Sequence, residues 1–294
     1  FGNGSMFDDF NNIVIISNSN LAQNYTVEFN EMWGSSGAQP NLTNSKFGPA
    51  KSDNTIHSFN IGGSTVESYF SPTDGTASKI VDAINSANFS LDVAMFTFTD
   101  NDLGDAVVAA KNRGVNVRCI IENVSYFGSE YNKLVAAGIP VISHENVTND
   151  FHHKYCIIDA MNSASDPIVV TGSHNWSNSA NDEYDENTLI FHDAVVANQY
   201  LEEFSKRHSV LSRIRDYDYK NEHIVLFPNP SNGSFSITGL KHAIDKLTVV
   251  NSVGQVVETI ENTGNTIHLE LERGMYYITL ISNDEVINKK INIE

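Results

Sequence analysis

Short apolar runs alternate with helix-like patterns from Val66 to Arg207, and this alternation limits the fold more than any other feature of the sequence. The segment at 102–112 runs into Gly114 and the segment at 130–137 into Gly138, and glycine commonly ends a helix. Strands separated by helices of this length predict a mostly parallel or mixed sheet covered by helices on both faces. Strands are expected at 66–70, 91–97, 115–121, 139–143, 154–159, 168–171 and 188–191, and helices at 76–87, 102–112, 130–137 and 194–207.

The sequence on either side of this segment has a different character. Residues 34–63 are rich in Gly, Ser, Asn and Pro and have few periodic apolar positions, which is typical of a linker. From 222 to 294, short apolar runs are separated by turn signals such as Asn229-Pro230 and Arg273-Gly274. This pattern predicts a small all-β sandwich that follows an α/β domain at 64–215.

Residues 1–33 repeat part of the α/β domain. An offset of 175 positions places Phe1 on Trp176, and the two stretches then agree without a gap at polar and apolar positions alike. We interpret residues 1–33 as the C-terminal remnant of a first copy of the domain, and we expect that copy's own His-x-Lys segment upstream of Phe1. The identities are Asn3/Asn178, Asn12/Asn187, Ile15/Ile190, Ala22/Ala197, Tyr25/Tyr200, Glu28/Glu203 and Phe29/Phe204.

The composition excludes some classes of protein. Eighteen Lys and Arg against 36 Asp and Glu give a formal net charge of −18, which repels polyanions and leaves nucleic acid only a local basic site. No apolar run approaches the roughly 18 residues that a membrane-spanning helix needs. Cys119 and Cys156 each lie in an apolar run, so we expect buried thiols rather than a disulfide.

Candidate catalytic groups are concentrated in two short motifs. The first begins at His152-His153-Lys154 and ends at Asp159, and the second is Gly172-Ser173-His174-Asn175. Because side chains alternate along a strand, His152 and Lys154 should share one face while His153 points away. An imidazole beside an ammonium group, with amide and hydroxyl donors from Asn175 and Ser173, suits phosphoryl transfer.

Two carboxylates complete the candidate site. Glu186, eleven residues past Asn175, is expected to bind the second ring nitrogen of His152 and to raise its basicity. Asp159 at the end of its strand is expected to be a positioning residue. Several histidines suggest zinc, but adjacent histidines on a strand diverge, no Cys-x-x-Cys or His-x-x-x-His spacing occurs, and a lysine disfavours a cation. We therefore expect no metal and no cofactor.

These motifs resemble those of the phospholipase D superfamily, whose signature is His-x-Lys-x4-Asp followed by Gly-Ser-x-Asn. The resemblance covers about 66–207 in full and 1–33 as a partial second copy. It implies a mixed sheet sandwiched between helices, with His152, Lys154 and Asn175 catalytic and Asp159, Ser173 and Glu186 in support. In that superfamily two such motifs meet, one histidine becoming phosphorylated and the other serving as acid. The implied partner is a second repeat upstream or a homodimer.

The partial copy departs from the complete one at a supporting position. Where the complete copy has Glu186, the offset of 175 positions gives Asn11, which has no charge. If Asn11 lies beside the missing histidine, the two histidines should differ in basicity, and the one backed by Glu186 should be the more easily protonated.

The C-terminal segment has a resemblance of its own. Leu226-Phe-Pro-Asn-Pro-Ser-Asn-Gly, Arg273-Gly-Met-Tyr-Tyr and the closing Lys289-Lys-Ile-Asn-Ile-Glu resemble the sorting domain of the type IX secretion system of Bacteroidetes. This implies export to the cell surface or the medium and an interaction with the secretion machinery.

Together these features predict an exported phosphodiesterase of phospholipase D type. Its expected substrate is a phospholipid headgroup or similar phosphodiester, hydrolysed through a phosphohistidine without metal. A secreted nuclease of the same superfamily and a surface-binding module that has lost its catalytic pairing are the alternatives. The acidic composition favours a lipid or another small diester over nucleic acid.

Overall fold

The computed structural model describes residues 8–294 except 146, 163, 223, 252–254 and 284, and it gives the backbone alone at 213–222, 285, 286 and 288. The chain divides into two compact units, residues 1–211 and residues 212–294, which are described separately. Within the described ranges, no helix combines the length and the apolar character that crossing a membrane requires.

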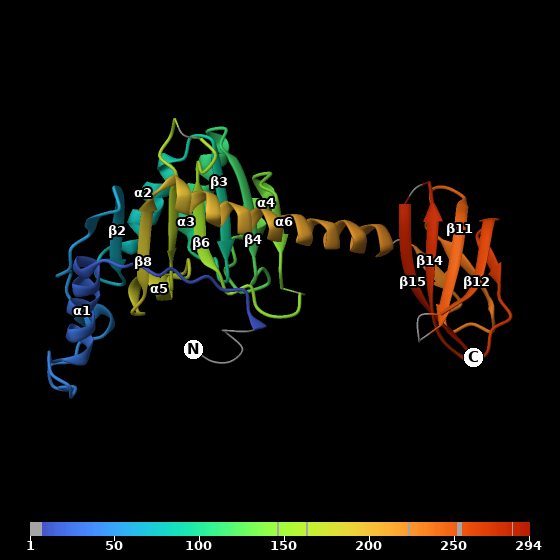
Figure 1. The fold of residues 1–294 in the computed structure, drawn as a ribbon, viewed down its shortest axis with the longest axis horizontal. Helices are drawn as coiled ribbons and strands as arrows, with labels where there is room; N and C mark the ends of the chain where they lie inside the picture. The colour runs from blue at the N-terminus through green and yellow to red at the C-terminus, as the bar shows by residue number, and fades with distance from the viewer. Residues whose placement is uncertain (1–7, 146, 163, 223, 252–254, 284) are drawn as a thin grey trace. The chain divides into compact units, whose positions relative to one another are not determined.

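The first unit is built on a mixed sheet, which confirms the predicted fold class (Figure 1). Among the residues described, this sheet has eight strands in the order β1-β2-β8-β7-β6-β3-β4-β5. Strands β3, β4 and β5 run parallel, and the other neighbouring pairs are antiparallel. The strands are β1 (Ser58–Ile61), β2 (Ser64–Phe70), β3 (Ser90–Met95), β4 (Asn116–Ile121), β5 (Val141–Ser143), β6 (Lys154–Ile158), β7 (Ile168–Gly172) and β8 (Asn187–His192).

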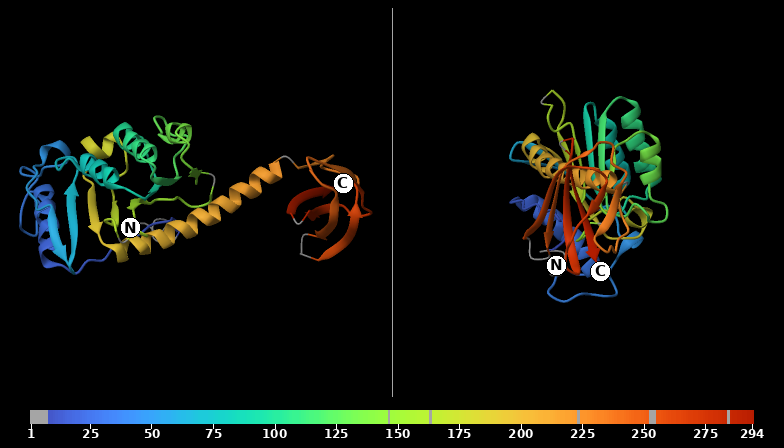
Figure 2. Two further views of the ribbon diagram at one scale, coloured as in Figure 1. Left: turned by 90° about the horizontal axis from the view of Figure 1, so that it is seen from above. Right: turned by 90° about the vertical axis from the view of Figure 1, so that its right-hand side faces the viewer.

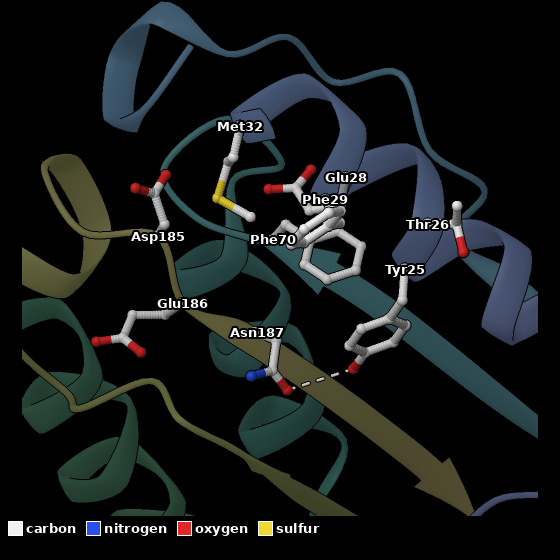
Figure 3. A pocket seen from close by; sticks show the side chains of 9 residues that line it. All are labelled: Tyr25, Thr26, Glu28, Phe29, Met32, Phe70, Asp185, Glu186 and Asn187. Carbon is white, nitrogen blue, oxygen red and sulfur yellow. Dashed lines mark hydrogen bonds between the residues drawn. The ribbon is translucent and has the colours of Figure 1, made fainter. Parts of the chain in front are cut away.

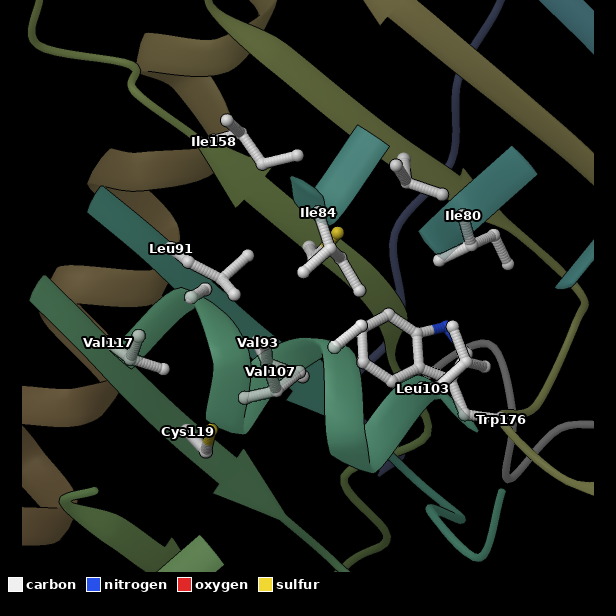
Figure 4. Close-up of a cluster of buried hydrophobic side chains, with 14 of the residues drawn as sticks. Ile80, Ile84, Leu91, Val93, Leu103, Val107, Val117, Cys119, Ile158 and Trp176 are labelled. Carbon is white, nitrogen blue, oxygen red and sulfur yellow. The ribbon is translucent and has the colours of Figure 1, made fainter. Parts of the chain in front are cut away.

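Helices cover both faces of this sheet, as the left view of Figure 2 shows. Side-chain alternation sorts the strand residues between two cores. Leu91 and Val93 of β3 pack with α2 and α3 on one face (Figure 4), while Ala94 packs with Leu21 of α1 and Phe204 of α6 on the other. The helices are α1 (Ser19–Trp33), the 3₁₀ turn η2 (Gly48–Ala50), α2 (Thr76–Ser86), α3 (Asn101–Asn112), α4 (Tyr131–Ala136), α5 (Asn178–Asp182) and α6 (Ala194–Glu222).

Two segments differ from the sequence-based expectation. Residues 34–63, expected to be a linker, include η2 and the edge strand β1, whose Phe59 is buried against the second core. The alternation in Ser58–Ile61 was too short to recognise as a strand. Helix α6, expected to end at Arg207, continues to Glu222, because the sequence from 208 to 222 contains neither Gly nor Pro to stop it.

Both cysteines are free and buried, as predicted. They lie in the core on the α2–α3 face of the sheet. Burial raises the pKa of Cys119 well above its ordinary value and that of Cys156 to about 12, so both thiols stay protonated.

After the end of α6, the second unit is a pair of antiparallel sheets, as the sequence from 222 to 294 predicts. In the described part, one sheet has the order β13-β10-β9 and the other β12-β11-β14-β15. Phe235, Leu247, Ile278 and Ile291 are among the side chains buried between them. The strands are β9 (Val225–Phe227), β10 (Ser234–Thr238), β11 (Ile244–Asn251), β12 (Val256–Thr263), β13 (Thr266–His268), β14 (Gly274–Ser282) and β15 (Glu285–Ile293).

Asp159 joins the end of β6 to the start of β3. Its carboxylate accepts hydrogen bonds from the backbone amides of Asn88 (2.9 Å), Phe89 (2.8 Å) and Ser90 (2.8 Å), and from the hydroxyl of Ser165 (2.6 Å). Burial alone would raise the pKa of Asp159, but these hydrogen bonds outweigh it and lower the pKa. The residue has φ 51°, a left-handed conformation that Asp and Asn adopt more readily than most residues.

We expect Asp159→Asn to destabilise the first unit by about 2–3 kcal/mol at pH 7, because an amide group cannot accept the same set of charged hydrogen bonds. Asparagine tolerates the backbone angle, so the change isolates the charge. The lowered pKa means that the wild-type contribution is present above the unfolded pKa and is lost as the pH falls through the folded one. Urea unfolding should therefore show the difference between variant and wild type shrinking below about pH 4. The exposed Asp82→Asn is the control, and equal losses in both variants would contradict this role.

Candidate active site

The two predicted motifs meet at one edge of the sheet. Strand β6 lies between β3 and β7 and is antiparallel to both, so Lys154 at its start pairs with Met95 at the end of β3. At the same edge β7 ends at Gly172, and β8 begins beside it at Asn187. The structure thus brings His152, Lys154 and the Gly-Ser-x-Asn motif to one edge.

His152 and Lys154 face the same aromatic ring, which agrees with the predicted shared face. The His152 ring lies edge-on to Phe96 with ring centroids 4.8 Å apart, and Nζ of Lys154 lies 5.0 Å from the centroid of the same ring. Nζ also donates to the backbone oxygen of His152 at 3.1 Å. His153 points elsewhere: its Nδ1 lies 3.0 Å from Oδ1 of Asn12.

The surroundings of both groups favour their uncharged forms. Burial, reinforced by the charge of Lys154, lowers the pKa of His152, while Asp9 and Asp150 oppose this weakly. Burial lowers the pKa of Lys154 to about 8, although the carboxylate of Glu186 raises it in part. Near pH 7, His152 is therefore mainly neutral and Lys154 mainly charged.

Asn11 is hydrogen-bonded to the second ring nitrogen of His152, where the sequence led us to expect Glu186. Its Oδ1 lies 3.1 Å from Nδ1 of His152, so the acceptor oxygen fixes the ring proton on Nδ1. Asn11 belongs to the N-terminal segment, which also anchors itself at Phe10, whose amide donates to the backbone oxygen of Asp150 at 2.8 Å. The earlier expectation put Asn11 beside a different histidine, and the structure puts it on His152.

The second motif fastens β7 to β8. Oγ of Ser173 accepts hydrogen bonds from the backbone amide (3.0 Å) and the side-chain amide (3.1 Å) of Asn187. Gly172 has φ 155°, and a Cβ there would lie 2.0 Å from the backbone oxygen of Asn187, so this close approach requires glycine. Oδ1 of Asn175 is buried and has no hydrogen-bond partner among the described residues.

Glu186 lines a pocket of about 410 Å³ between α1 and the start of β8 (Figure 3). Tyr25, Phe29 and Phe70 give the pocket aromatic walls, and the Tyr25 hydroxyl donates to Oδ1 of Asn187 at 3.3 Å. Glu186 influences the predicted catalytic pair electrostatically, through Lys154.

Asp159 is not part of this cluster. It follows β6 at the end opposite to Lys154, and five residues of strand correspond to about 16 Å. The carboxylate is occupied by hydrogen bonds from the first amide of β3 and the two amides before it. Asp159 therefore positions the strand that carries Lys154 and does not reach the reacting groups.

Sequence reasoning did not identify Phe96, Asn187 or Asn11 as members of the site. Phe96 had no signal in the sequence, whereas the internal repeat aligns Asn11 with Glu186 and Asn187 with Asn12. The roles of Phe96 and Asn187 depend on which strands are neighbours, and a single sequence does not give the strand order.

Within the described residues, one group of side chains has the spacing of a metal site: Asp53, His57 and Asp74, with candidate ligand atoms within 4.8 Å of one another. Both ring nitrogens of His57 already have partners, Nδ1 at 2.9 Å from the backbone oxygen of Ser68 and Nε2 at 3.0 Å from Oδ1 of Asp53. The group includes none of the predicted catalytic residues.

Comparisons with known proteins confirm both family resemblances. Residues 80–208 match the family model described as the PLD-like domain of cardiolipin synthase, and residues 225–294 match the secretion system C-terminal sorting domain. Curated relatives include the mitochondrial cardiolipin hydrolases of Xenopus tropicalis, 34% identical over 136 residues, and Chlamydomonas reinhardtii, 32% identical over 139 residues. These alignments cover 46% and 47% of this chain and 61% and 59% of those proteins. The chain thus spans less than two thirds of their length.

Two bacterial proteins are among the solved structures that the chain matches, and one of them is described as a phospholipase D family member. The family member Nuc from Salmonella typhimurium is 28% identical, with a TM-score of 0.44, and the match covers 50% of this chain and 95% of that one. NucT from Helicobacter pylori is 24% identical, with a TM-score of 0.43, and the match covers 48% and 93%.

We expect Asn11→Asp to raise the pKa of His152, because a carboxylate at 3.1 Å from Nδ1 would stabilise the imidazolium form. A shift of about one unit or more is expected for a charged partner at this distance, whereas Asn11→Ala should leave the pKa within about half a unit. Titration of the His152 ring by NMR measures both. Asn20→Asp, which adds the same charge at an exposed position on α1, is the control, and an equal shift in that variant would exclude a specific contact.

Proposed function

We propose that this chain, which carries a phospholipase D-like domain and a C-terminal secretion sorting domain, is an exported phosphodiesterase that cleaves its substrate through a phosphohistidine at His152 without a metal. The sorting domain indicates a secreted or cell-surface location and an interaction with the type IX secretion machinery. The substrate we propose is a phospholipid headgroup diester or a similar small diester.

One observation carries this proposal: a neutral, oriented imidazole stands beside a charged ammonium group. Asn11 accepts the proton on Nδ1 of His152, which leaves the lone pair on Nε2 for attack. Lys154, which lies against the same Phe96 ring as His152, supplies positive charge for the nonbridging oxygens of the phosphoryl group. The Ser173 hydroxyl and the Asn175 amide are the remaining donors at this edge.

The chemistry requires two steps. In the first, Nε2 of His152 bonds to phosphorus, the bond from phosphorus to the leaving oxygen breaks, and an acid protonates that oxygen. In the second, water attacks phosphorus, the phosphorus–nitrogen bond breaks, and the same acid, now deprotonated, takes the proton from water. The resemblance to the phospholipase D superfamily implies that a second histidine is this acid.

The second histidine would come from a preceding copy of the domain or from a partner chain. Helix α1 begins at Ser19 and α6 at Ala194, at the same offset of 175 positions that relates the two sequences. Their preceding residues Asn18 and Asp193 both accept hydrogen bonds from the first turn of the helix that follows. This agreement supports the interpretation of residues 1–33 as the end of another copy.

Side-chain exposure also supports a missing half. Ile15 is 92% exposed and Phe29 is 51% exposed, whereas their counterparts, Ile190 on β8 and Phe204 on α6, are 2% and 0% exposed and lie in the two cores on opposite faces of the sheet. The rest of a first copy would cover the former pair in the same way. If the halves are related by a twofold axis, the contact of Asn11 with His152 has its counterpart in a contact of Glu186 with the second histidine.

The test is an assay of the full-length protein and of its His152→Asn variant on phosphatidylcholine and on single- and double-stranded DNA, with EDTA present. We expect wild-type turnover of a diester to survive EDTA and to fall at least about a thousandfold in the variant. Mass spectrometry of the acid-labile adduct should place a phosphoryl group, still esterified to the part of the substrate that has not left, on His152. His268→Asn, in the second unit, is the control.

Two results would exclude this mechanism: loss of wild-type activity in EDTA, or a His152→Asn variant as active as the wild type. Turnover of DNA rather than phosphatidylcholine would replace the lipid assignment with that of a secreted nuclease. Binding of either substrate without turnover by the full-length protein would indicate a surface-binding module.

The pKa values of the pair predict a bell-shaped pH profile. Activity should fall on the acid side as His152 protonates, at a pH below its ordinary value of 6.5, and on the alkaline side near pH 8 as Lys154 loses its charge. Because Glu186 raises the pKa of Lys154, Glu186→Gln should move the alkaline limb to lower pH. The control is the exposed Glu183→Gln, and kcat/KM measured from pH 5 to 10 is the readout. If the alkaline limb of Glu186→Gln lies at the same pH as in the wild type, deprotonation of Lys154 is not its cause.

A further inference from the structure

The loop that follows β4 carries two exposed aromatic side chains. Tyr126 is 63% exposed and Phe127 is 98% exposed. The amide of Ser129 donates to the backbone oxygen of Tyr126 at 3.0 Å, and Gly128 in the third position has φ 81°, so a tight turn presents Phe127 at its tip. A large apolar side chain held almost fully in solvent costs free energy unless it meets an apolar partner.

This loop lies beside the candidate active site. Strand β4 is parallel to β3, and Ile121 pairs with Met95 at the edge where β6 begins. Asn123 donates its backbone amide to the oxygen of Phe96 and its side-chain amide to the hydroxyl of Thr97, both at 3.0 Å. Phe96 is the ring that contacts His152. Four residues of chain reach at most about 14 Å, so Phe127 stays near the site.

An exposed aromatic residue also stands on the other side of the site. Tyr184, 56% exposed, lies shortly before β8 begins, on the loop that leads to Glu186. In the sheet order β8-β7-β6-β3-β4, the catalytic strand β6 lies between the strand that follows Tyr184 and the strand that precedes Phe127. The exposed aromatic residues therefore flank His152 and Lys154.

Charge decides which apolar partner fits. The loop sequence from 123 to 129 is Asn-Val-Ser-Tyr-Phe-Gly-Ser and contains no charged residue. The hydroxyl of Ser125 donates to Glu145, and Asp150 stands close enough to His152 to act on its pKa, so the charges near the loop are acidic apart from that of Lys154 at the site itself. A polynucleotide stacked on these rings would meet Lys154 at the reacting diester but no cation on the loop for its other phosphates, and the net charge of −18 would repel it and an anionic bilayer alike.

We propose that Tyr126 and Phe127 form an interfacial anchor that inserts into the surface of a zwitterionic lipid aggregate and holds its diesters at His152. Phenylalanine at the tip enters the acyl region, and tyrosine, with an apolar ring and a polar hydroxyl, sits at headgroup level. Insertion needs no basic residues, because a zwitterionic surface carries no net charge. This inference rests on the proposed function, since it names the physical state of the substrate for the same site.

The experiment measures binding of the full chain to vesicles of phosphatidylcholine by sedimentation, which needs no turnover. Phe127→Ser should weaken binding about tenfold or more and Tyr126→Ser by less, since the first removes the deeper apolar group. Phe89→Ser is the control, because Phe89 is 51% exposed but precedes β3 at the opposite end of the strand. His152→Asn should bind vesicles like the wild type, which separates the failure of this anchor from the failure of the catalytic proposal.

Several results would overturn the anchor. Failure of the wild-type protein to bind the vesicles would exclude it, and so would binding of Phe127→Ser as tight as that of the wild type. Reduced affinity of Phe127→Ser for a single-stranded oligonucleotide, with vesicle binding unchanged, would assign the loop to nucleic acid instead. A changed oligomeric state of Phe127→Ser in solution, with vesicle binding unchanged, would assign the loop to contact between chains.

Discussion

The antiparallel placement of β6 between β3 and β7 is the constraint on which the candidate site depends. Asp159 fixes it at one end of β6 by accepting hydrogen bonds from three consecutive amides, the last of which begins β3. At the other end Lys154 is then opposite Met95, and the chain before it carries His152 over the Phe96 ring. One short motif therefore serves both ends of a strand: its aspartate sets the strand in place, and its histidine and lysine are presented at the far edge.

The same packing that places the two groups also tunes them. Burial lowers the pKa of both His152 and Lys154, and the lysine charge lowers that of the histidine further. A more exposed site would leave the histidine more readily protonated and less able to attack. Deeper burial would lower the pKa of Lys154 further and leave the lysine uncharged. The carboxylate of Glu186 opposes this effect of burial. The electrostatics of the site thus follow from its partial burial at the ends of the central strands.

Local patterns predicted the elements of the sheet well and its order not at all. The strands 91–97 and 154–159 match β3 and β6 to within two residues, because each is a mainly apolar run bounded by polar residues. Edge strand β1 has too few residues for its alternation to stand out. The motif residues were predicted because their spacing is itself informative. Phe96 joins them only because β3 is the neighbour of β6, which no local pattern specifies.

The contact of Asn11 with His152 changes the meaning of the asymmetry between the two copies. Sequence comparison alone pairs Asn11 and Glu186 as equivalents and leaves open which histidine each one supports. With Asn11 on His152, an uncharged partner orients the ring without stabilising its imidazolium form, which favours a nucleophile. A twofold relation would put Glu186 on the other histidine, where a carboxylate favours the protonated form that an acid needs. Under the proposed mechanism and a twofold arrangement, the inequality of the two side chains would make His152 the nucleophile and the second histidine the acid.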